Sequence, residues 1–537
     1  MCVVAGCPAV YAHGPASKHS GTGQVALMTG AEGLVHTLLG SGVDVCFANP
    51  GTTEMHFVAA LERIPGMRCI LGLQENVVTG AADGYWRMAQ KPAATLLHCG
   101  PGLANGLANL HNARRARSGI VNIVGDQATY HRPLDSPLTA DTTGWARGVS
   151  AWTRTVTDAA AVGRDGAAAV EAARQGQIAT LILPADLAWN SNSSSSEALP
   201  LVPAPQPATS AIEEAARALR SAQPTLLLLG GASLRAAPLA NAHRIAAATG
   251  AQIMAQMFNA RMERGRGRPS LTRVPYPVDQ ALAKLAEFKH LILVGATPPV
   301  SFFAYPGKPG RLYPPESEVH VLARPEEDGP FALAELADAL GAPSVSPPDV
   351  GLQREVARGA PTVAAAAQTI AALLPENAVV VNEAGTCGPA IFSASQRSAP
   401  HDWLDLTGGA IGGGLPMAVG AAIAAAGRRV VALQADGAGM YTVQALWTHA
   451  RERLNITTVI FSNRAYAILL SEFANVGGNP GPAAAGMMQL SSPDIGWTEL
   501  AIGLGVEARR AESCEQLADL LRASFRRSGP FLIEIAI

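Results

Sequence analysis

The chain of 537 residues is too long for a single hydrophobic core, so its length predicts two to four domains. Its residues are 48% hydrophobic and 15% charged with a net charge of −2, which gives no basic surface for nucleic acid. No run of 18 apolar residues occurs, which argues against a membrane span. The seven cysteines are scattered without a Cys-x-x-Cys pair, which argues against a disulfide framework and favours a cytoplasmic protein.

Composition divides the chain into segments. The first 27 residues lack the basic start and apolar stretch of a signal peptide, and we interpret residues 1–27 as a disordered extension. Pro-rich stretches at residues 190–207 and 343–361 have the composition of linkers. They separate three segments, 28–189, 208–342 and 362–537, in which short apolar runs alternate with longer helical patterns. The sequence therefore predicts three α/β domains, each built on a doubly wound parallel sheet.

Apolar periodicity places the expected elements in chain order. In the first segment, Cys69 to Leu73 is predicted to be a buried strand and Val77 to Met88 a helix. Further strands are expected at residues 95–97, 120–124, 225–229, 291–294, 319–322, 378–381, 430–433, 457–461 and 531–535.

Two strands of the third segment end in side chains that suit a hard metal ion. Asp436 follows the strand at 430–433, and Asn463 follows the strand at 457–461. Their oxygens could converge on one Mg2+, which takes few protein ligands and completes its shell with phosphate and water. Gly437 and Ala438 are small enough for backbone N–H groups to approach a diphosphate at the start of the next helix. Without Asn463, the Asp-Gly pair would more simply be a turn.

This arrangement resembles the Gly-Asp-Gly to Asn motif of thiamine-diphosphate enzymes, including the separation of 27 residues between Asp436 and Asn463. The resemblance implies thiamine diphosphate and Mg2+ as cofactors, with the metal held by Asp436, Asn463 and the backbone carbonyl of Ala465. It also assigns Tyr466, at the end of the motif, to the cofactor site. The first glycine of the motif is Ala435 here, and its methyl group would crowd the diphosphate unless its φ angle is negative.

A glycine-rich run, LTGGAIGGGLP at residues 406–416, permits close backbone approach to a ligand. A flexible loop before a helix would have the same composition. In the thiamine-diphosphate family a large apolar residue of this loop bends the cofactor, and Ile411 matches that position, with Gly409 in the same cofactor contact. Thr386, after NEAG at 382–385, is a further candidate for contact with the diphosphate.

Glu75 lies between an apolar strand and an apolar helix of the first segment. In thiamine-diphosphate enzymes a glutamate hydrogen-bonds the pyrimidine ring of the cofactor and thereby activates it, and the resemblance assigns this catalytic role to Glu75. By position alone, an exposed first-turn glutamate that complements the helix dipole is the alternative. The surroundings favour catalysis, because GLQEN at 72–76 and GAADGY at 80–85 resemble the pyrimidine-binding domain of the acetolactate synthase and benzoylformate decarboxylase families.

The resemblance continues through ANPGTTE at 48–54 and LHCGPG at 97–102 and covers essentially the whole chain after Met28. It implies a pyrimidine-binding, a central and a diphosphate-binding domain. His98 matches a histidine that benzoylformate decarboxylases use near the substrate, with a buried structural histidine as the alternative. Thr52 stands where those enzymes carry a substrate-contacting serine. Their second catalytic histidine has no counterpart.

The central segment carries two further motifs. LGGAS at 229–233 follows a strand but lacks a full dinucleotide fingerprint, so FAD, which acetolactate synthases often bind, stays open as a cofactor. The run RMERGRGRP at 261–269 predicts a solvated loop or, alternatively, a contact with an anionic substrate or nucleotide.

Three functions are compatible with these residues. The first is an acetolactate synthase-like carboligase, which joins two pyruvates in branched-chain amino acid biosynthesis. The second is a benzoylformate-type decarboxylase or lyase acting on a 2-oxo acid. The third is a non-catalytic paralogue that binds the cofactor as a regulatory subunit, which Ala435 and the missing histidine favour. In the family, the domains that share a cofactor come from different subunits, so we expect a homo-oligomer with its active sites at the subunit interface.

Overall fold

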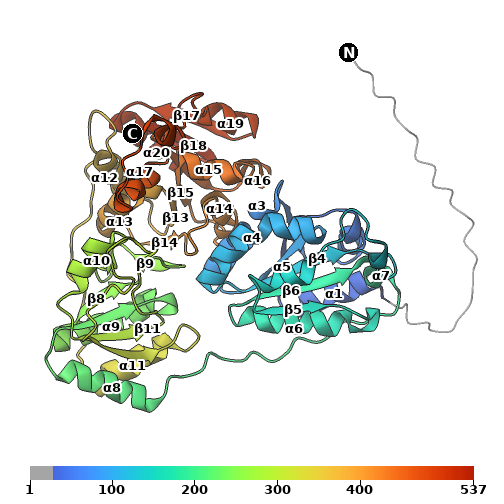
Figure 1. The fold of residues 1–537 in the computed structure, drawn as a ribbon, viewed down its shortest axis with the longest axis horizontal. Helices are drawn as coiled ribbons and strands as arrows, with labels where there is room; N and C mark the ends of the chain where they lie inside the picture. Colours follow the sequence, from blue (N-terminus) through green and yellow to red (C-terminus); the bar gives the residue numbers. More distant parts are fainter. Residues whose placement is uncertain (1–27) are drawn as a thin grey trace, which may run out of the picture.

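Three sheets form the framework of the computed structural model, which describes residues 28–537 (Figure 1). The expected disordered extension, residues 1–27, lies outside the described residues. All three sheets are flanked by helices, and all strand pairs but one are parallel, so the predicted class of three α/β domains is confirmed. Among the described helices, none combines the length and the apolar character that a bilayer crossing requires.

The first sheet has six parallel strands in the order β2-β1-β3-β4-β6-β5. They are β1 (Val45–Asn49), β2 (Arg68–Leu71), β3 (Ala93–Leu97), β4 (Ile120–Asp126), β5 (Trp152–Thr155) and β6 (Ile178–Pro184). The helices are α1 (Gly30–Gly40), α2 (Met55–Arg63), α3 (Glu75–Ala89), α4 (Cys99–Ala116), α5 (Thr142–Arg147), α6 (Val162–Arg174) and α7 (Ala185–Trp189), with the short 3-10 turn η1 (Thr52–Glu54) before α2. Strands β3, β4 and β6 are buried throughout, because helices cover both faces of the sheet.

An extended connection leads to the second sheet, whose five parallel strands have the order β10-β8-β7-β11-β12 (Figure 1). They are β7 (Thr225–Leu229), β8 (Gln252–Ala255), β10 (Thr272–Arg273), β11 (His290–Val294) and β12 (Glu318–Ala323), with helices α8 (Thr209–Arg220), α9 (Ala236–Thr249), α10 (Val278–Leu285) and α11 (Gly329–Ala339). A side chain at Gly230, in the run LGGAS, would lie 2.4 Å from the carbonyl oxygen of Gly295. This glycine therefore serves the packing of two neighbouring loops, and FAD binding stays a prediction.

The third sheet has seven strands in the order β17-β18-β16-β15-β13-β14-β9. They are β9 (Met262–Arg264), β13 (Val379–Glu383), β14 (His401–Asp405), β15 (Val430–Ala435), β16 (Ile456–Ser462), β17 (Glu507–Ala511) and β18 (Phe531–Ala536). The helices are α12 (Val363–Leu373), α13 (Gly388–Ala394), α14 (Gly414–Ala424), α15 (Asp436–Gly439), α16 (Ala445–Arg451), α17 (Ala467–Asn475), α18 (Pro482–Gly486), α19 (Trp497–Gly503) and α20 (Cys514–Arg526).

Strand β9 corrects the prediction of a solvated loop at residues 261–269. It lies in the range assigned to the central domain but pairs antiparallel with β14 at the edge of the third sheet. Arg264 is only 2% exposed, and its guanidinium lies 3.4 Å from the ring centroid of Phe392. The aromatic face stabilises the buried cation, which is why so charged a run can form a strand.

The first and third domains are joined by α3 packing against α14. A side chain at Gly84 of α3 would lie 2.1 Å from the carbonyl oxygen of Met417, and one at Gly420 of α14 would lie 1.8 Å from that of Ala81. Only glycine permits such backbone contact. The packing holds α3, which begins with Glu75, against the third domain.

Candidate active site

Glu75 is the first residue of α3, and Gln74 caps the helix by accepting the backbone N–H groups of Asn76 and Val77. Glu75 is 8% exposed, so the alternative of an exposed first-turn glutamate is wrong. Asn105 of α4, which the sequence did not single out, donates from Nδ2 to Glu75 Oε2 at 3.0 Å. The carboxylate is thus buried and oriented while Oε1 has no hydrogen-bond partner among the described residues.

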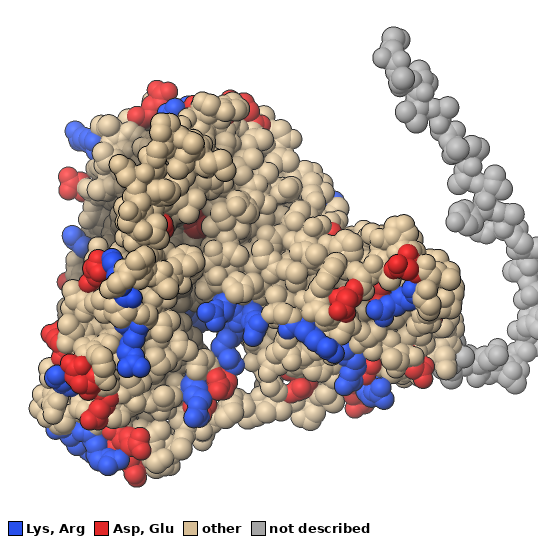
Figure 2. All heavy atoms as spheres, in the orientation of Figure 1, with Lys and Arg blue, Asp and Glu red and all other residues tan. Residues whose placement is uncertain are grey.

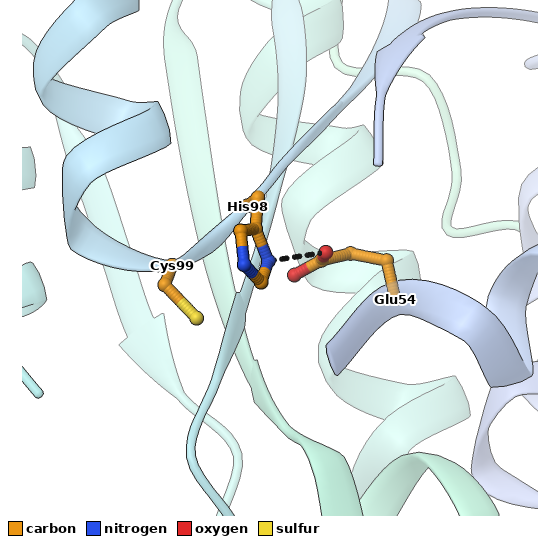
Figure 3. Close-up of side chains that lie close together, drawn as sticks. All are labelled: Glu54, His98 and Cys99. Atoms are coloured by element: carbon orange, nitrogen blue, oxygen red, sulfur yellow. Dashed lines mark hydrogen bonds and ion pairs between the residues drawn. The ribbon is translucent and has the colours of Figure 1, made fainter. Parts of the chain in front are cut away.

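His98 follows β3, and its imidazole pairs with the carboxylate of Glu54 (Figure 3). The distance from His98 Nδ1 to Glu54 Oε2 is 2.8 Å, and the Glu54 side chain is 1% exposed. This hydrogen bond raises the pKa of His98 above its ordinary value, with burial opposing the shift and the charges of Glu54 and Glu75 adding to it. A side chain at Gly102 would lie 3.3 Å from Glu75 Oε1 and 3.5 Å from His98 Cβ, so the two predicted catalytic residues flank one glycine. With a quarter of its side chain exposed, His98 is not a fully buried structural histidine.

The backbone next to His98 and Glu54 leaves space for the imidazole ring. A side chain at Gly51 would lie 2.3 Å from the His98 ring, and Cys99 adopts a left-handed φ of +52°, a conformation that costs energy in a non-glycine residue. Burial raises the pKa of the Cys99 thiol to about 11, so this cysteine stays protonated. Thr53 Oγ1 lies 3.2 Å from His98 Nδ1. Thr52 is exposed beside the pair, and its side chain makes no hydrogen bond among the described residues, so its contact with substrate stays a prediction.

Asp436 begins α15 directly after β15 and is 2% exposed. The backbone N–H of Gly437 donates to its Oδ1 at 2.8 Å, and that of Arg464 donates to Oδ2 at 2.7 Å. Burial raises the pKa of Asp436 above its ordinary value. No basic side chain of the described residues pairs with this carboxylate, and the guanidinium of Arg464 turns instead to Asp494 at 3.1 Å. A buried carboxylate without a cationic side chain fits a bound metal ion.

Asn463 follows β16 at the same edge of the sheet, because β15 and β16 are parallel with Ala435 opposite Phe461. Its Oδ1 accepts the N–H of Ala465 at 3.1 Å. Between these predicted ligands, Arg464 has a left-handed φ of +55°, and the resulting bend brings its N–H onto Asp436. The structure thus brings Asp436 and the loop 463–465 together, while their binding of Mg2+ stays a prediction.

Ala435, the departure from the family motif, has an ordinary extended backbone with φ −75° and ψ 145°. Its methyl group has space around it: even a Cβ atom added at the neighbouring Gly385 would lie 3.5 Å away, an ordinary van der Waals distance. Ala435 therefore causes no strain. Gly437, in contrast, cannot be replaced freely, because a side chain there would lie 2.5 Å from the ring of Tyr466. Ala438 is buried next to it, at 7% exposure.

The glycine-rich run is held by Glu383, a residue that the sequence did not single out as functional. Glu383 ends β13, is 6% exposed, and accepts the N–H of Gly412 at 2.6 Å and that of Gly414 at 2.7 Å. Burial raises the pKa of this carboxyl. From the first domain, Asn109 of α4 donates to the carbonyl of Gly412 at 3.1 Å. The run is therefore a fixed loop, and the alternative of a flexible one is wrong.

Aromatic side chains of the central domain cover this run. Gly409 has a φ of +77°, and a side chain there would lie 2.5 Å from the ring of Phe302. Phe302 packs against Phe303, Phe258 and Tyr276, with ring centroids 4.8, 5.8 and 5.6 Å away. Phe302 and Phe303 remain 37% and 54% exposed. They form an apolar wall beside the predicted cofactor loop.

Hydrogen bonds connect the aromatic wall to α17, the helix that follows the loop 463–465. Glu472 of α17 accepts the hydroxyl of Tyr276 at 3.1 Å and that of Tyr305 at 2.7 Å. Of the remaining predicted residues, Ile411 is half-buried in the glycine-rich run, and Thr386 is exposed in the turn after β13. Their cofactor contacts stay predictions.

These residues form two sets. We call Glu54, Glu75 and His98 the pyrimidine half, and Asp436, Asn463 and Tyr466 with the glycine-rich loop 408–414 the diphosphate half. Among the described residues, no hydrogen bond or ion pair connects the three side chains of the pyrimidine half to the diphosphate half.

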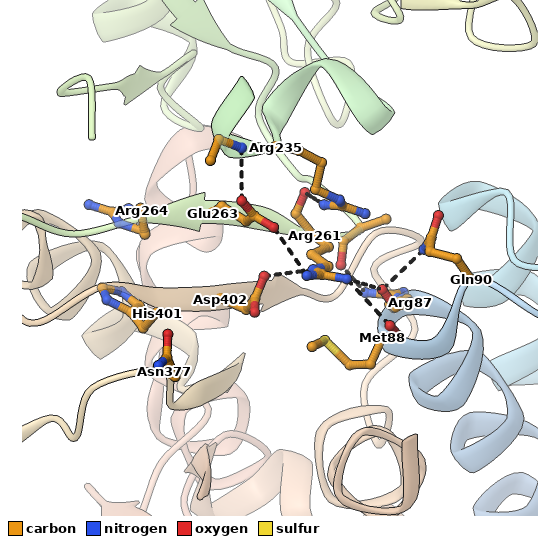
Figure 4. A network of polar contacts seen from close by, with 12 residues as sticks. Arg87, Met88, Gln90, Arg235, Arg261, Glu263, Arg264, Asn377, His401 and Asp402 are labelled. Carbon is orange, nitrogen blue, oxygen red and sulfur yellow. Dashed lines mark hydrogen bonds and ion pairs between the residues drawn. The ribbon is translucent and has the colours of Figure 1, made fainter. Parts of the chain in front are cut away.

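The three domains meet at a polar junction around Arg261 (Figure 4). Its Nε donates to Asp402 at 2.6 Å, and a terminal nitrogen reaches the carbonyls of Arg87 at 3.2 Å and Met88 at 3.4 Å. Arg235 donates to the carbonyl of Arg261 at 2.6 Å. The guanidinium of Arg261 is therefore occupied by protein groups, which removes it as a contact for an anionic ligand.

Other charges also serve domain association. Arg87 pairs with Asp83 at 2.7 Å with both side chains buried, and it donates to the carbonyl of Asp405 in the third domain at 2.6 Å. Lys and Arg side chains gather where the first and central domains face each other (Figure 2), and Arg117 pairs with Glu326 across these domains at 3.9 Å.

Comparison with known proteins identifies the family. Two family models match, "Thiamine pyrophosphate enzyme, N-terminal TPP binding domain" over residues 28–146 and "Thiamine pyrophosphate enzyme, C-terminal TPP binding domain" over residues 383–535. A Mycobacterium tuberculosis protein named "Putative acetolactate synthase large subunit IlvX" is 50% identical over 513 residues, which cover 95% of this chain and 99% of that protein. The chain belongs to the thiamine pyrophosphate enzyme family.

More distant relatives cover nearly as much of the chain. Benzoylformate decarboxylase of Pseudomonas aeruginosa is 28% identical over 92% of this chain and 96% of its own length. The structure of a thiamine diphosphate-dependent 4-hydroxybenzoylformate decarboxylase from Rhodococcus jostii RHA1 has a TM-score of 0.81 at 25% identity, covering 94% of this chain and 98% of that one. Thiamine diphosphate as cofactor and a carboligase or decarboxylase activity are thereby confirmed. The non-catalytic alternative also loses one of its two supports, since Ala435 causes no strain.

Proposed function

We propose that this thiamine pyrophosphate enzyme decarboxylates a 2-oxo acid with an apolar side chain and releases the aldehyde, with Mg2+ holding the diphosphate of the cofactor. The proposal depends above all on the pair of His98 and Glu54, 2.8 Å apart beside Glu75. Aldehyde release requires a proton donor at the substrate, and an imidazolium stabilised by a buried carboxylate is such a donor.

The residues of each half have separate tasks. Glu75, oriented by Asn105, would hold a proton between its carboxylate and the pyrimidine ring. Asp436, Asn463 and the carbonyl of Ala465 would hold Mg2+. When bound, thiamine diphosphate supplies the electron sink for loss of CO2 from a 2-oxo acid.

His98 would act on the substrate itself. Its protonated ring can attract the carboxylate of an incoming 2-oxo acid and, after CO2 has left, donate a proton to the substrate carbon. Thr52, exposed at the start of η1, would contact the same substrate.

The wall of Phe302 and Phe303 supports an apolar substrate side chain. Both rings are partly exposed, and Phe302 lies against Gly409 of the cofactor loop. Aromatic rings gain most from contact with flat apolar groups, so an aryl side chain such as that of benzoylformate fits better than the methyl group of pyruvate.

The M. tuberculosis relative at 50% identity favours a second candidate, acetolactate synthesis from two pyruvates. In that reaction a second carbonyl takes the place of the proton, and the enzyme would act in branched-chain amino acid biosynthesis in the cytoplasm. For either reaction we propose a homo-oligomer in which the pyrimidine half of one subunit meets the diphosphate half of another.

One experiment separates the candidates. The purified protein with thiamine diphosphate and Mg2+ is given benzoylformate or pyruvate, and benzaldehyde, acetaldehyde and acetolactate are each quantified. Benzaldehyde as the main product supports the decarboxylase, and acetolactate as the main product replaces it with the second candidate. The variant Glu75→Gln serves as the control for turnover that does not depend on the cofactor.

A further inference from the structure

A cluster of two histidines and a glutamate lies on the central domain, apart from the active-site residues. His290 begins β11, and Glu318 and His320 belong to β12, the edge strand of the second sheet. The two strands are parallel, with His290 opposite Glu318 and Ile292 opposite His320. Because side chains alternate along a strand, Glu318 and His320 project from the same face as His290.

The three donor atoms are spaced as metal ligands are. Nδ1 of His290 lies 3.1 Å from Nε2 of His320, and Oε2 of Glu318 lies 3.6 Å from the first nitrogen and 3.8 Å from the second. A tetrahedral Zn2+ with bonds of about 2.0–2.1 Å places its ligand atoms about 3.3 Å from one another. The three atoms therefore approximate one face of such a tetrahedron without rearrangement of the strands.

Burial and exposure complete the requirements of a site. His290 is 8% exposed, and its Nε2 has no hydrogen-bond partner among the described residues, so the hydrogen bonding of this buried ring is confined to Nδ1. The Glu318 side chain is 70% exposed, which leaves an entry path and room for a water molecule as fourth ligand.

We propose that His290, Glu318 and His320 form a binding site for one divalent transition-metal ion, with Zn2+ as the fitting ion. Two imidazoles and one carboxylate suit Zn2+ and exclude a preference for Mg2+, which takes oxygen ligands. The ion would pin the edge strand β12 to β11. This site is independent of the cofactor and of the reaction proposed above.

The test uses the full-length protein saturated with thiamine diphosphate and Mg2+ and freed of transition metals. Zn2+ binding is measured by calorimetry, and Co2+ serves as a spectroscopic substitute whose absorption bands report tetrahedral coordination. We expect one ion per chain. His320→Gln should weaken binding by more than about 100-fold, because loss of even an outer partner of a ligand typically costs 10–100-fold.

A control variant and a second variant of the cluster make the outcome unambiguous. His36→Gln removes an exposed histidine from α1 and should leave the affinity unchanged. Glu318→Gln, on an exposed side chain, replaces His320→Gln if that variant does not fold, and it should weaken binding as well. Zn2+ binding that survives both cluster variants would belong elsewhere, for example to Cys2, Cys7, His13 and His19, and would overturn the proposal. Absence of stoichiometric binding would overturn it too, and would leave only a hydrogen bond between His290 and His320.

Discussion

The two halves of the active site hold their buried acidic groups in different ways. In the pyrimidine half each carboxylate has a side-chain partner, His98 for Glu54 and Asn105 for Glu75, and Glu54 also accepts the backbone N–H of Gly51. In the diphosphate half, Asp436 has hydrogen bonds from backbone N–H groups and no basic side chain pairs with it among the described residues. One half therefore carries its own positive partner, while the other leaves a negative charge for a ligand to neutralise.

The diphosphate half is therefore the one that depends on its cofactors for electrostatic balance. Without a cation, burial of Asp436 disfavours its charged form, as the raised pKa indicates. Glu54, in contrast, already has the imidazole of His98 as its partner before any ligand binds.

Glu75→Gln should lower kcat by about 100- to 10,000-fold, the usual contribution of a positioned acid or base. The amide has nearly the same shape and can still accept from Asn105, so the fold and cofactor affinity should change little. Steady-state kinetics and calorimetric titration with thiamine diphosphate measure the two effects. Full activity in this variant would remove Glu75 from the mechanism.

Asp436→Asn should weaken Mg2+-dependent cofactor binding by about 100-fold or more, since even indirect partners of metal ligands contribute 10–100-fold. In the cofactor-free protein the wild-type carboxyl, whose pKa burial raises, stabilises the fold at low pH, and that stabilisation is lost as pH rises through the folded-state pKa. The amide of the variant can accept only one of the two backbone N–H groups, so we expect the variant to lose this pH dependence even where it is less stable overall. Thermal unfolding of the cofactor-free proteins at several pH values checks this, and an unchanged pH dependence would contradict the contrast.

A mixture of the two inactive variants tests whether the halves come from different subunits. In a mixed dimer of Glu75→Gln and Asp436→Asn chains, a shared site combines the intact halves of both chains once per dimer. Random association then restores about a quarter of the wild-type activity. Sites formed within single chains would restore none, so co-expression with two affinity tags and a rate measurement decide the matter.

Glu54→Gln should shift the alkaline limit of activity to lower pH. The hydrogen bond to Glu54 raises the pKa of His98, so the wild-type ring stays protonated at higher pH than an ordinary histidine. Loss of the carboxylate removes that stabilisation, and a proton-donating His98 loses its proton earlier as pH rises. The pH profile of kcat reports the shift, and an unchanged profile would show that His98 donates no proton in the limiting step.

Ala435→Gly should have the smallest effect, less than about twofold on cofactor affinity. The methyl group lies on extended backbone and in ordinary contact distance, so its removal relieves no strain. A large gain in affinity by calorimetry would show instead that Ala435 impairs the diphosphate half.

The diphosphate half was the more predictable one from sequence. Asp436 and Asn463 follow adjacent parallel strands, and such strand ends meet at one edge whatever the details of packing. Glu383 was missed because its partners, the N–H groups of Gly412 and Gly414, come from a loop whose path only the folded chain defines.

In the pyrimidine half, sequence indicated Glu75 and His98 but not their partners. Asn105 lies on a different helix from Glu75, and Glu54 and His98 are 44 residues apart in the sequence. No local sequence pattern can therefore predict either contact. Strand β9 was missed for a different reason, because the aromatic ring that accommodates Arg264 is supplied by the distant Phe392.

The glycine contacts between α3 and α14 bear on how this enzyme could be engineered. Backbone touches backbone at Gly84 and Gly420, so larger residues there cannot be absorbed by a change of rotamer. The packing of α3 against α14 thus fixes the position of Glu75, and substitutions in this helix pair can change that position very little. The wall of Phe302 and Phe303, in contrast, consists of partly exposed side chains on a loop. New substrate ranges should therefore be sought by diversifying that loop while the helix pair is left untouched.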